Sequence, residues 1–300
     1  MAGNPTGYRY LTAEAVGRLH NLSLVARSVV EGFVTGLHRS PYHGFSVEFS
    51  GHREYSPGDN LRYIDWQAYG RTDRYYVKQY EEETNLRCHI LLDASGSMSY
   101  GSGAVTKYEY GAYLAASLAY LMIRQRDSVG LVTFDRDIRL RIPPGSTTAH
   151  LDRLLVQLEH TSPSKTTGIS ETFHALAENI KKRGLIIIIS DLFDDEREVF
   201  KALRHFRQKK HEVVIFHVLD PWELDFPFNR TSDFLDVESR DKLQVDPRYV
   251  RREYLKEVNA FIEAYRRGCA EGLMEYVLAD TRAPFEMLLA SYLAKRKRLS

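Results

Sequence analysis

Leu-Leu-Asp-Ala-Ser-Gly-Ser-Met, at residues 91–98, joins an apolar run to a loop of small, hydroxyl-bearing residues. The apolar run ends on Asp93, and Ser95, Gly96 and Ser97 follow almost at once. One carboxylate, two hydroxyls and a glycine that allows a tight turn can surround a hard cation such as Mg2+, which prefers oxygen ligands. The stretch therefore predicts a buried strand of a parallel sheet whose carboxyl end carries a metal-binding loop.

The composition indicates a globular chain without a dedicated surface for nucleic acids. The 300 residues are 43% hydrophobic, which suffices for one large domain with additions or for two smaller ones. There are 41 basic and 40 acidic residues, and the formal net charge is +1. A nucleic-acid-binding domain usually carries a basic excess or stripe, so we expect no nucleic-acid partner.

The sequence also lacks the patterns of secreted and membrane-spanning proteins. Cys88 and Cys269 cannot build a disulfide framework. No stretch approaches the roughly 18 consecutive apolar residues of a membrane-spanning helix, and the N-terminus has no apolar signal-peptide core. We therefore expect a cytoplasmic protein with no transmembrane segment.

Alternating strand and helix patterns after residue 86 predict an α/β domain. Strands are expected at 88–92, 129–134, 138–142, 185–190, 212–218 and 274–278, and helices at about 108–122, 151–158, 173–180, 247–267 and 285–293. The run 185–189 is apolar on both faces, as in a parallel sheet covered by helices. A break at 135–137 predicts a hairpin that adds an antiparallel edge strand. The predicted fold class is α/β, with a doubly wound, mostly parallel sheet.

Two further parts are expected outside this regular alternation. The N-terminal part has an amphipathic helix at about 12–36 and a small β-rich segment at 44–84, with strands at 45–49 and 75–80 and a turn at 56–59. The other part is an insertion at about 220–246, with a loop at 221–227 and a hairpin at 234–245. The predicted domains are 1–85, the N-terminal helix plus the β-rich segment, and 86–300, the α/β domain with its insertion.

Oxygen ligands reach the same edge of the predicted sheet from three places. Asp93, Ser95 and Ser97 follow one strand, and Asp191 follows a later one. Thr167 stands at the start of the helix before that later strand, where it could serve as a helix N-cap, as a ligand or as both. Ligands of open α/β sheets bind beyond the carboxyl ends of the strands, so these side chains are candidates for one metal site.

The five residues resemble the metal-ion-dependent adhesion site of von Willebrand factor type A domains. That motif is an Asp-x-Ser-x-Ser loop, then a Thr, then an Asp after a later strand. The matching positions are Asp93, Ser95, Ser97, Thr167 and Asp191. The resemblance implies that the hydroxyls bind the metal directly and the aspartates mainly through water, so that the ion takes a further Glu or Asp from a partner. It implies Mg2+ as the cofactor, with Mn2+ and Ca2+ as alternatives.

The upstream part of the chain resembles the bacterial domain-of-unknown-function family 58. The matching positions are Glu48-Phe49, Arg53-Glu54-Tyr55, Pro57-Gly58-Asp59, Arg62, Ile64-Asp65-Trp66, Arg71 and Glu81-Glu82-Glu83. The resemblance covers roughly residues 40–290. Members of this family are commonly associated with MoxR-type AAA+ ATPases, which implies an adaptor or chaperone-like role beside such an ATPase.

Three functions agree with these residues. The leading hypothesis is a non-catalytic, metal-dependent protein-binding module, with no catalytic residue. The alternative is a Mg2+-dependent phosphate-ester hydrolase that uses Asp93 and Asp191. It is less favoured because Ser95 stands where aspartyl-phosphate phosphatases of α/β fold carry a second Asp, and because the phosphate-loop and nucleophile-elbow motifs are missing. A structural subunit with a relic metal loop is the third hypothesis.

Overall fold

A computed structural model describes residues 46–56, 64–72, 74–83, 86–163, 168–235, 242–284 and 287–289, together with Leu22, Ala26 and Tyr292. The chain forms two compact units, Pro41–Leu86 and a larger one that comprises Met1–Ser40 and Arg87–Ser300. Each unit is described by itself.

The larger unit is built on a six-stranded sheet with the order β10-β7-β6-β3-β4-β5. Its strands are β3 (Arg87–Asp93), β4 (Ser128–Phe134), β5 (Ile138–Gly145), β6 (Leu185–Ser190), β7 (Glu212–Leu219) and β10 (Glu275–Asp280). All neighbours are parallel except β5, which pairs antiparallel with β4 at the edge of the sheet. The predicted α/β class, the six strands and the antiparallel edge hairpin are confirmed.

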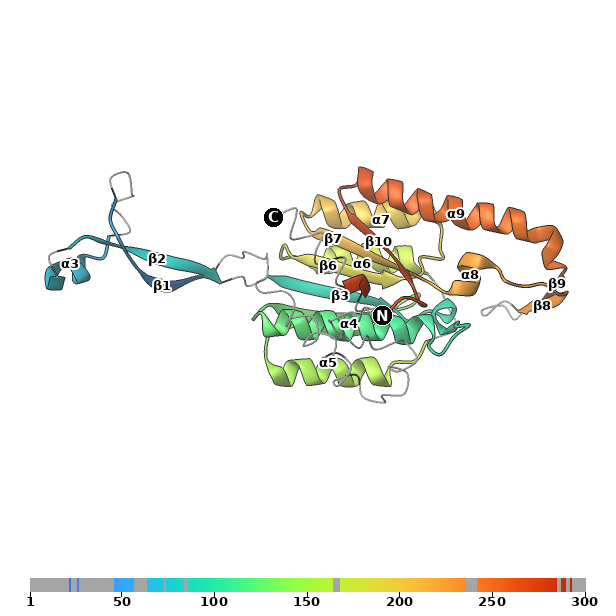
Figure 1. Cartoon of the computed structure of the whole chain (residues 1–300), viewed down its shortest axis with the longest axis horizontal. Coiled ribbons are helices and arrows are strands. Elements are labelled where there is room, and N and C mark those ends of the chain that lie inside the picture. The colour runs from blue at the N-terminus through green and yellow to red at the C-terminus, as the bar shows by residue number, and fades with distance from the viewer. Residues whose placement is uncertain are drawn as a thin grey trace, which may run out of the picture. The chain divides into compact units, whose positions relative to one another are not determined.

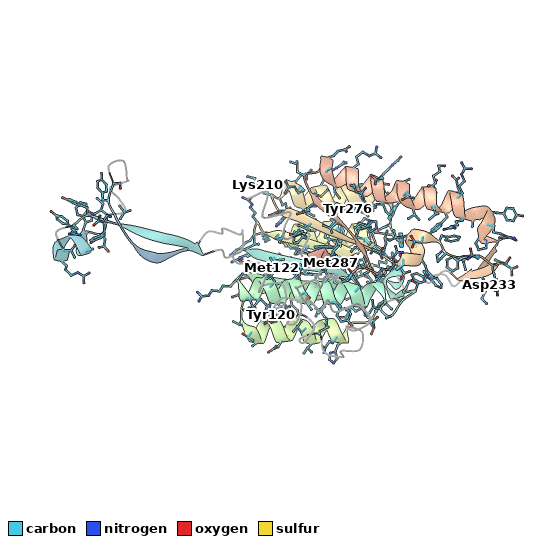
Figure 2. All side chains as sticks on the ribbon, viewed as in Figure 1. Tyr120, Met122, Lys210, Asp233, Tyr276 and Met287 are labelled. Carbon is cyan, nitrogen blue, oxygen red and sulfur yellow. The ribbon has the colours of Figure 1, made fainter. Side chains whose placement is uncertain are left out.

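Helices cover both faces of this sheet (Figure 1). They are α4 (Lys107–Arg124), α5 (Thr148–His160), α6 (Ile169–Asn179), α7 (Glu196–Gln208) and α9 (Pro247–Glu271). Leu92 and Ile189 face α4, and their side chains lie beside Gly111 of that helix. Leu91 and Ile188 point to the other face, into the core shared with α6, α7 and α9. Because both faces are covered, every residue of β6 is buried, and side chains fill the layers between sheet and helices (Figure 2).

Several elements differ from their predictions. Helix α7 was not predicted, although Val199, Leu203 and Phe206 form a buried stripe along it. The expected loop at 221–227 was wrong, because α8 (Pro221–Asp225) begins there. Asp220 caps this short helix and Pro221 occupies its first turn, where a missing N–H costs nothing.

The hairpin predicted within the insertion is confirmed, and β8 (Ser232–Leu235) pairs antiparallel with β9 (Lys242–Val245). In the smaller unit β1 (Ser46–Glu54) pairs antiparallel with β2 (Tyr76–Glu83), with a register shift between Phe49 and Gly51. Helix α3 (Trp66–Thr72) precedes β2 and was not predicted. The turn at 56–59 lies outside the described residues after Ser56.

The N-terminal helix predicted at 12–36 lies outside the described residues except at Leu22 and Ala26, which are helical and buried. The backbone N–H of Leu22 donates to Glu159 of α5 at 3.0 Å. The predicted domain 1–85 includes these two residues, whereas the contact with Glu159 connects Leu22 to the α/β unit. Cys88 and Cys269 are buried free thiols. Among the described residues, no helix combines the length and apolarity needed to cross a membrane.

Candidate functional site

The candidate site lies where the strand order of the sheet reverses. Strands β3 and β6 are neighbours in the middle of the sheet, but the chain leaves β3 toward β4 on one side and leaves β6 toward β7 on the other. Such a switch point opens a crevice at the carboxyl ends of the two strands. Asp93 ends β3, and Asp191 follows β6 directly. The fold therefore brings together the two aspartates that the sequence predicted as metal ligands.

Asp93 is fully buried, and both of its carboxylate oxygens accept hydrogen bonds. The N–H of Ser95 donates to Oδ1 at 2.8 Å, and the hydroxyl of Ser190 donates to Oδ2 at 2.5 Å. Burial, together with the nearby charge of Asp191, raises the pKa of Asp93 to about 7. A cation at this position would stabilise the ionised carboxylate, because it would offset both causes of the rise.

The hydroxyls of Ser95 and Ser97 lie together beside this carboxylate. Their Oγ atoms are 3.1 Å apart, with Ser95 buried and Ser97 partly exposed. The loop that carries them is fixed, because the N–H of Ala94 donates to the carbonyl of Phe134 at 2.7 Å and the side chain of Met98 is fully buried. The structure thus brings Asp93, Ser95 and Ser97 to one point, as predicted. Thr167 lies outside the described residues.

The backbone turns sharply immediately after Asp191. Leu192 has a φ of 56°, which side chains with a Cβ rarely adopt. Its N–H donates to the Ser190 hydroxyl at 2.9 Å, and its carbonyl accepts a hydrogen bond from the hydroxyl of Tyr265 at 3.3 Å. These contacts hold the turn in place, and strained residues of this kind gather at functional sites.

His217 holds the backbone of Asp191 in place through a hydrogen bond. Burial lowers the pKa of His217 to about 4, so its ring is neutral at pH 7. Its Nε2 lies 2.9 Å from the Asp191 carbonyl, and its Nδ1 lies 2.8 Å from the hydroxyl of Tyr276 on β10. A carbonyl only accepts, so Nε2 carries the proton and Nδ1 accepts from Tyr276. The ring therefore orients the site without adding charge to it.

Lys107, at the first position of α4, is the main feature that the sequence did not reveal. Its side chain is fully buried, and Nζ lies 2.7 Å from Asp191 Oδ2 and 2.6 Å from Glu223 Oε1. The ring of Phe193 covers the ammonium, with its centroid 4.7 Å from Nζ. Burial lowers the pKa of Lys107, but the two carboxylates outweigh burial and raise it. The available signal was a lysine in the first turn of a helix, where the helix dipole disfavours positive charge.

Helix α8 brings Glu223 to this position. The side chain of Asp220 accepts from the N–H of Trp222, and Glu223 accepts from the N–H of Asp220, each at 2.8 Å. This reciprocal capping fixes the first turn of α8. The second oxygen of Asp220 accepts from the N–H of Ser102 at 2.8 Å, in the loop that follows the predicted serine ligands. The insertion therefore contacts the site through both Glu223 and Asp220.

The donor set suits a small, hard cation. It offers the carboxylates of Asp93 and Asp191 and the hydroxyls of Ser95 and Ser97, which are oxygen ligands of the kind that Mg2+ prefers. Across the described residues, no group of three or more His, Cys, Asp or Glu is arranged to hold a metal. In the described part of the chain, the candidate site has only two residues of these types, Asp93 and Asp191. Its other donors are the serine hydroxyls, which such a group does not include.

These features define an α/β protein with a mostly parallel, helix-covered six-stranded sheet, consistent with a von Willebrand factor A-like, Rossmann-type fold, and with an acidic site at its switch point. Residues 51–262 match the family described as "Protein of unknown function DUF58", and the chain belongs to this family. The predicted resemblance to this family is confirmed, over a shorter stretch than the 40–290 expected.

The chain is also similar to individual proteins. It is 25% identical over 265 residues to uncharacterised proteins of Mycobacterium tuberculosis and Mycobacterium bovis, which covers 85% of this chain and 82% of theirs. A solved structure of the conserved hypothetical protein BatB from Bacteroides thetaiotaomicron is 19% identical, covers 72% of this chain and 100% of that chain, and gives a TM-score of 0.48. An aerotolerance-related membrane protein from Bacteroides fragilis is 19% identical over 70% of this chain and 99% of that chain, also with a TM-score of 0.48.

Proposed function

We propose that this protein is a non-catalytic, metal-dependent protein-binding module with a metal-ion-dependent adhesion site of the von Willebrand factor A type. One observation carries the proposal: the buried carboxylates of Asp93 and Asp191 lie at the switch point of the sheet beside the paired hydroxyls of Ser95 and Ser97. Burial raises the pKa of Asp93, and repulsion between its carboxylate and that of Asp191 raises it further. A bound cation would relieve this repulsion.

Mg2+ is the proposed cofactor, with Mn2+ and Ca2+ as alternatives, and Asp93, Ser95, Ser97, Thr167 and Asp191 would hold it. When bound, the ion supplies a positive centre that attracts an anionic ligand. Lys107 already neutralises part of the charge of Asp191 through its 2.7 Å contact with Oδ2. The site then compensates only part of the positive charge of the ion. The rest can attract a carboxylate from outside, such as a Glu or Asp side chain of a partner.

The proposed partner is a MoxR-type AAA+ ATPase or its client protein, which this protein would serve as an adaptor or chaperone-like factor in the cytoplasm. The support is the family membership together with the chemistry of the site. A purified MoxR-type ATPase provides the test, since its capture by the protein should need Mg2+ and fail in the presence of a chelator.

A Mg2+-dependent phosphate-ester hydrolase is the second candidate, because the pKa of Asp93 near 7 suits a general acid or base. Two observations favour the binding role over it. The side chain of Asp93 is fully buried, and both its oxygens are engaged by Ser95 and Ser190. A carboxylate held in this way is poorly placed to attack a substrate.

Titration with Mg2+ tests the proposed metal site. The melting temperature of the wild type should rise, because a ligand that binds only the folded state adds about 2.7 kcal/mol at 100 times its Kd. The Asp93→Ala and Ser95→Ala variants should show little or no rise. Asp152→Ala, which removes an exposed carboxylate of α5, should behave like the wild type. Equal shifts in all four proteins would overturn the metal site, and turnover of a phosphate ester that Asp93→Ala abolishes would favour the hydrolase.

A further inference from the structure

A pair of histidines on the outer side of the larger unit is unrelated to the site at the switch point. His174 lies on α6 and His205 on α7, and their Nδ1 atoms are 3.4 Å apart. The ring centroids are 5.6 Å apart, so the two Nδ1 edges face each other. A normal hydrogen bond between nitrogen and its acceptor is shorter, about 2.7–3.2 Å. The contact is therefore long for an imidazole–imidazole hydrogen bond.

The same distance fits two nitrogens that bind one metal ion. Zinc binds imidazole nitrogen at about 2.0–2.1 Å in tetrahedral geometry, which places two such nitrogens about 3.4 Å from each other. We propose that His174 and His205 form a binding site for a borderline divalent ion of the Zn2+, Ni2+ or Cu2+ class. Imidazole favours these ions, whereas Mg2+ favours oxygen. The site is therefore chemically distinct from the proposed Mg2+ site.

Glu178 supplies the supporting contact that histidine ligands usually have. Its Oε1 lies 2.8 Å from Nε2 of His205, and it stands one helical turn after His174 on α6. A ligating histidine normally donates its second N–H to a carboxylate, which fixes the tautomer and leaves the other nitrogen free for the metal. Glu178 thus directs Nδ1 of His205 toward His174. Lys209 Nζ binds the other carboxylate oxygen at 2.7 Å and keeps Glu178 in place.

The spacing of the two helices is set by the core beneath the histidines. Phe173 and Phe206 are the sequence neighbours of His174 and His205, and both are fully buried. Their rings pack edge to face with centroids 6.2 Å apart. Because this contact holds α6 and α7 at a fixed separation, little rearrangement is needed when an ion binds. The side chain of His205 is 22% exposed, so ions can reach it from solvent.

The described residues contain no third His, Cys, Asp or Glu arranged with this pair around one ion. Water or an external ligand would fill the remaining positions, as in zinc sites that keep open positions. Because imidazole is its ligand type, the site selects Zn2+, Ni2+ or Cu2+ over Mg2+. Because the protein supplies two nitrogens, the affinity is moderate.

Isothermal titration of the full chain with ZnCl2, in excess Mg2+ to saturate the oxygen site, tests the proposal. The wild type should bind one Zn2+ at this pair. His174→Ala and His205→Ala should each weaken Zn2+ binding about tenfold or more. Glu178→Gln should also weaken Zn2+ binding, because it removes the supporting carboxylate. His160→Ala, which removes an exposed histidine of α5, should leave binding unchanged. X-ray absorption of the zinc complex should show two nitrogen neighbours at about 2.0–2.1 Å.

Unchanged Zn2+ affinity in both His174→Ala and His205→Ala would overturn the proposal and leave the pair as a hydrogen-bonded contact. Loss of Zn2+ binding in Asp93→Ala alone would do the same, since the ion would then occupy the switch-point site. His174→Gln and His205→Gln serve as variants that preserve polarity. A circular dichroism spectrum like that of the wild type shows that a loss of affinity in these variants reflects lost ligands and intact folding.

Discussion

Replacing Lys107 with methionine should destabilise the protein more than any surface change of the same type. Methionine has a similar length and fills the same buried space, but it leaves Asp191 and Glu223 without their cation. The side chain of Asp191 is fully buried and that of Glu223 is 15% exposed. Removing one partner of a buried ion pair costs about 3–5 kcal/mol. We expect a loss of about this size in the free energy of unfolding.

Urea unfolding at pH 7, followed by far-UV circular dichroism in the presence of a chelator, measures this loss. Lys201→Met is the matched control, because Lys201 also pairs on a helix, 3.3 Å from Glu198, but both side chains are more than half exposed. Its loss should stay below about 1 kcal/mol. Adding Glu223→Gln to Lys107→Met should restore part of the stability, since one unpaired carboxylate disappears. Equal losses for the two Lys→Met variants would refute the role assigned to Lys107.

Three further predictions concern the neutral core histidine, the helix contacts and the insertion. Burial lowers the pKa of His89 from 6.5 to about 4, so the unfolded chain takes up a proton between these pH values that the folded chain does not. The contribution of His89 to the free energy of unfolding should therefore be complete above pH 6.5 and fall below it by up to about 1.4 kcal/mol per pH unit, and His89→Gln should remove this contribution from the slope of a pH series of urea unfolding curves. Gly268→Ala should cost about 1–3 kcal/mol, because its Cβ would lie 2.3 Å from the buried ring of Phe200, whereas Gly103→Ala, with no atom within 4 Å, should change the urea midpoint little. In a Trp66→Phe variant Trp222 is the single tryptophan, and Mg2+ should shift its fluorescence through the neighbouring Glu223–Lys107–Asp191 contacts; a shift that persists in Glu223→Gln would contradict this route.

Local patterns explain which parts of the fold were predictable. The run 185–189 reads as a doubly covered strand because all its side chains are apolar, and β6 is buried throughout. Asp93, Ser95 and Ser97 could be proposed as metal ligands from the sequence because they stand within five residues at the end of a strand. Helix α7 was missed because charged residues stand at 196–198, 201, 204 and 207 and interrupt its apolar stripe along the sequence.

The contacts of Lys107 could not be predicted in the same way. Its partners Asp191 and Glu223 lie 84 and 116 residues away in the sequence. Only the strand order brings the start of α4, the end of β6 and the insertion to one edge of the sheet. A buried lysine has no periodic signal of its own, since its partners are set by topology rather than by spacing.

The antiparallel strand β5 forms one edge of the six-stranded sheet. It is an outer strand, and an outer strand with free backbone groups can recruit a strand from a second molecule. Arg139 and Arg141 place charge along it, and their guanidinium groups bind the carbonyls of Ser162 and Asn179. Pro143 and Pro144 have no backbone N–H to offer, and the register of β5 shifts where they stand. Charge, proline and the register shift together disfavour the pairing of this edge with a strand of a second molecule.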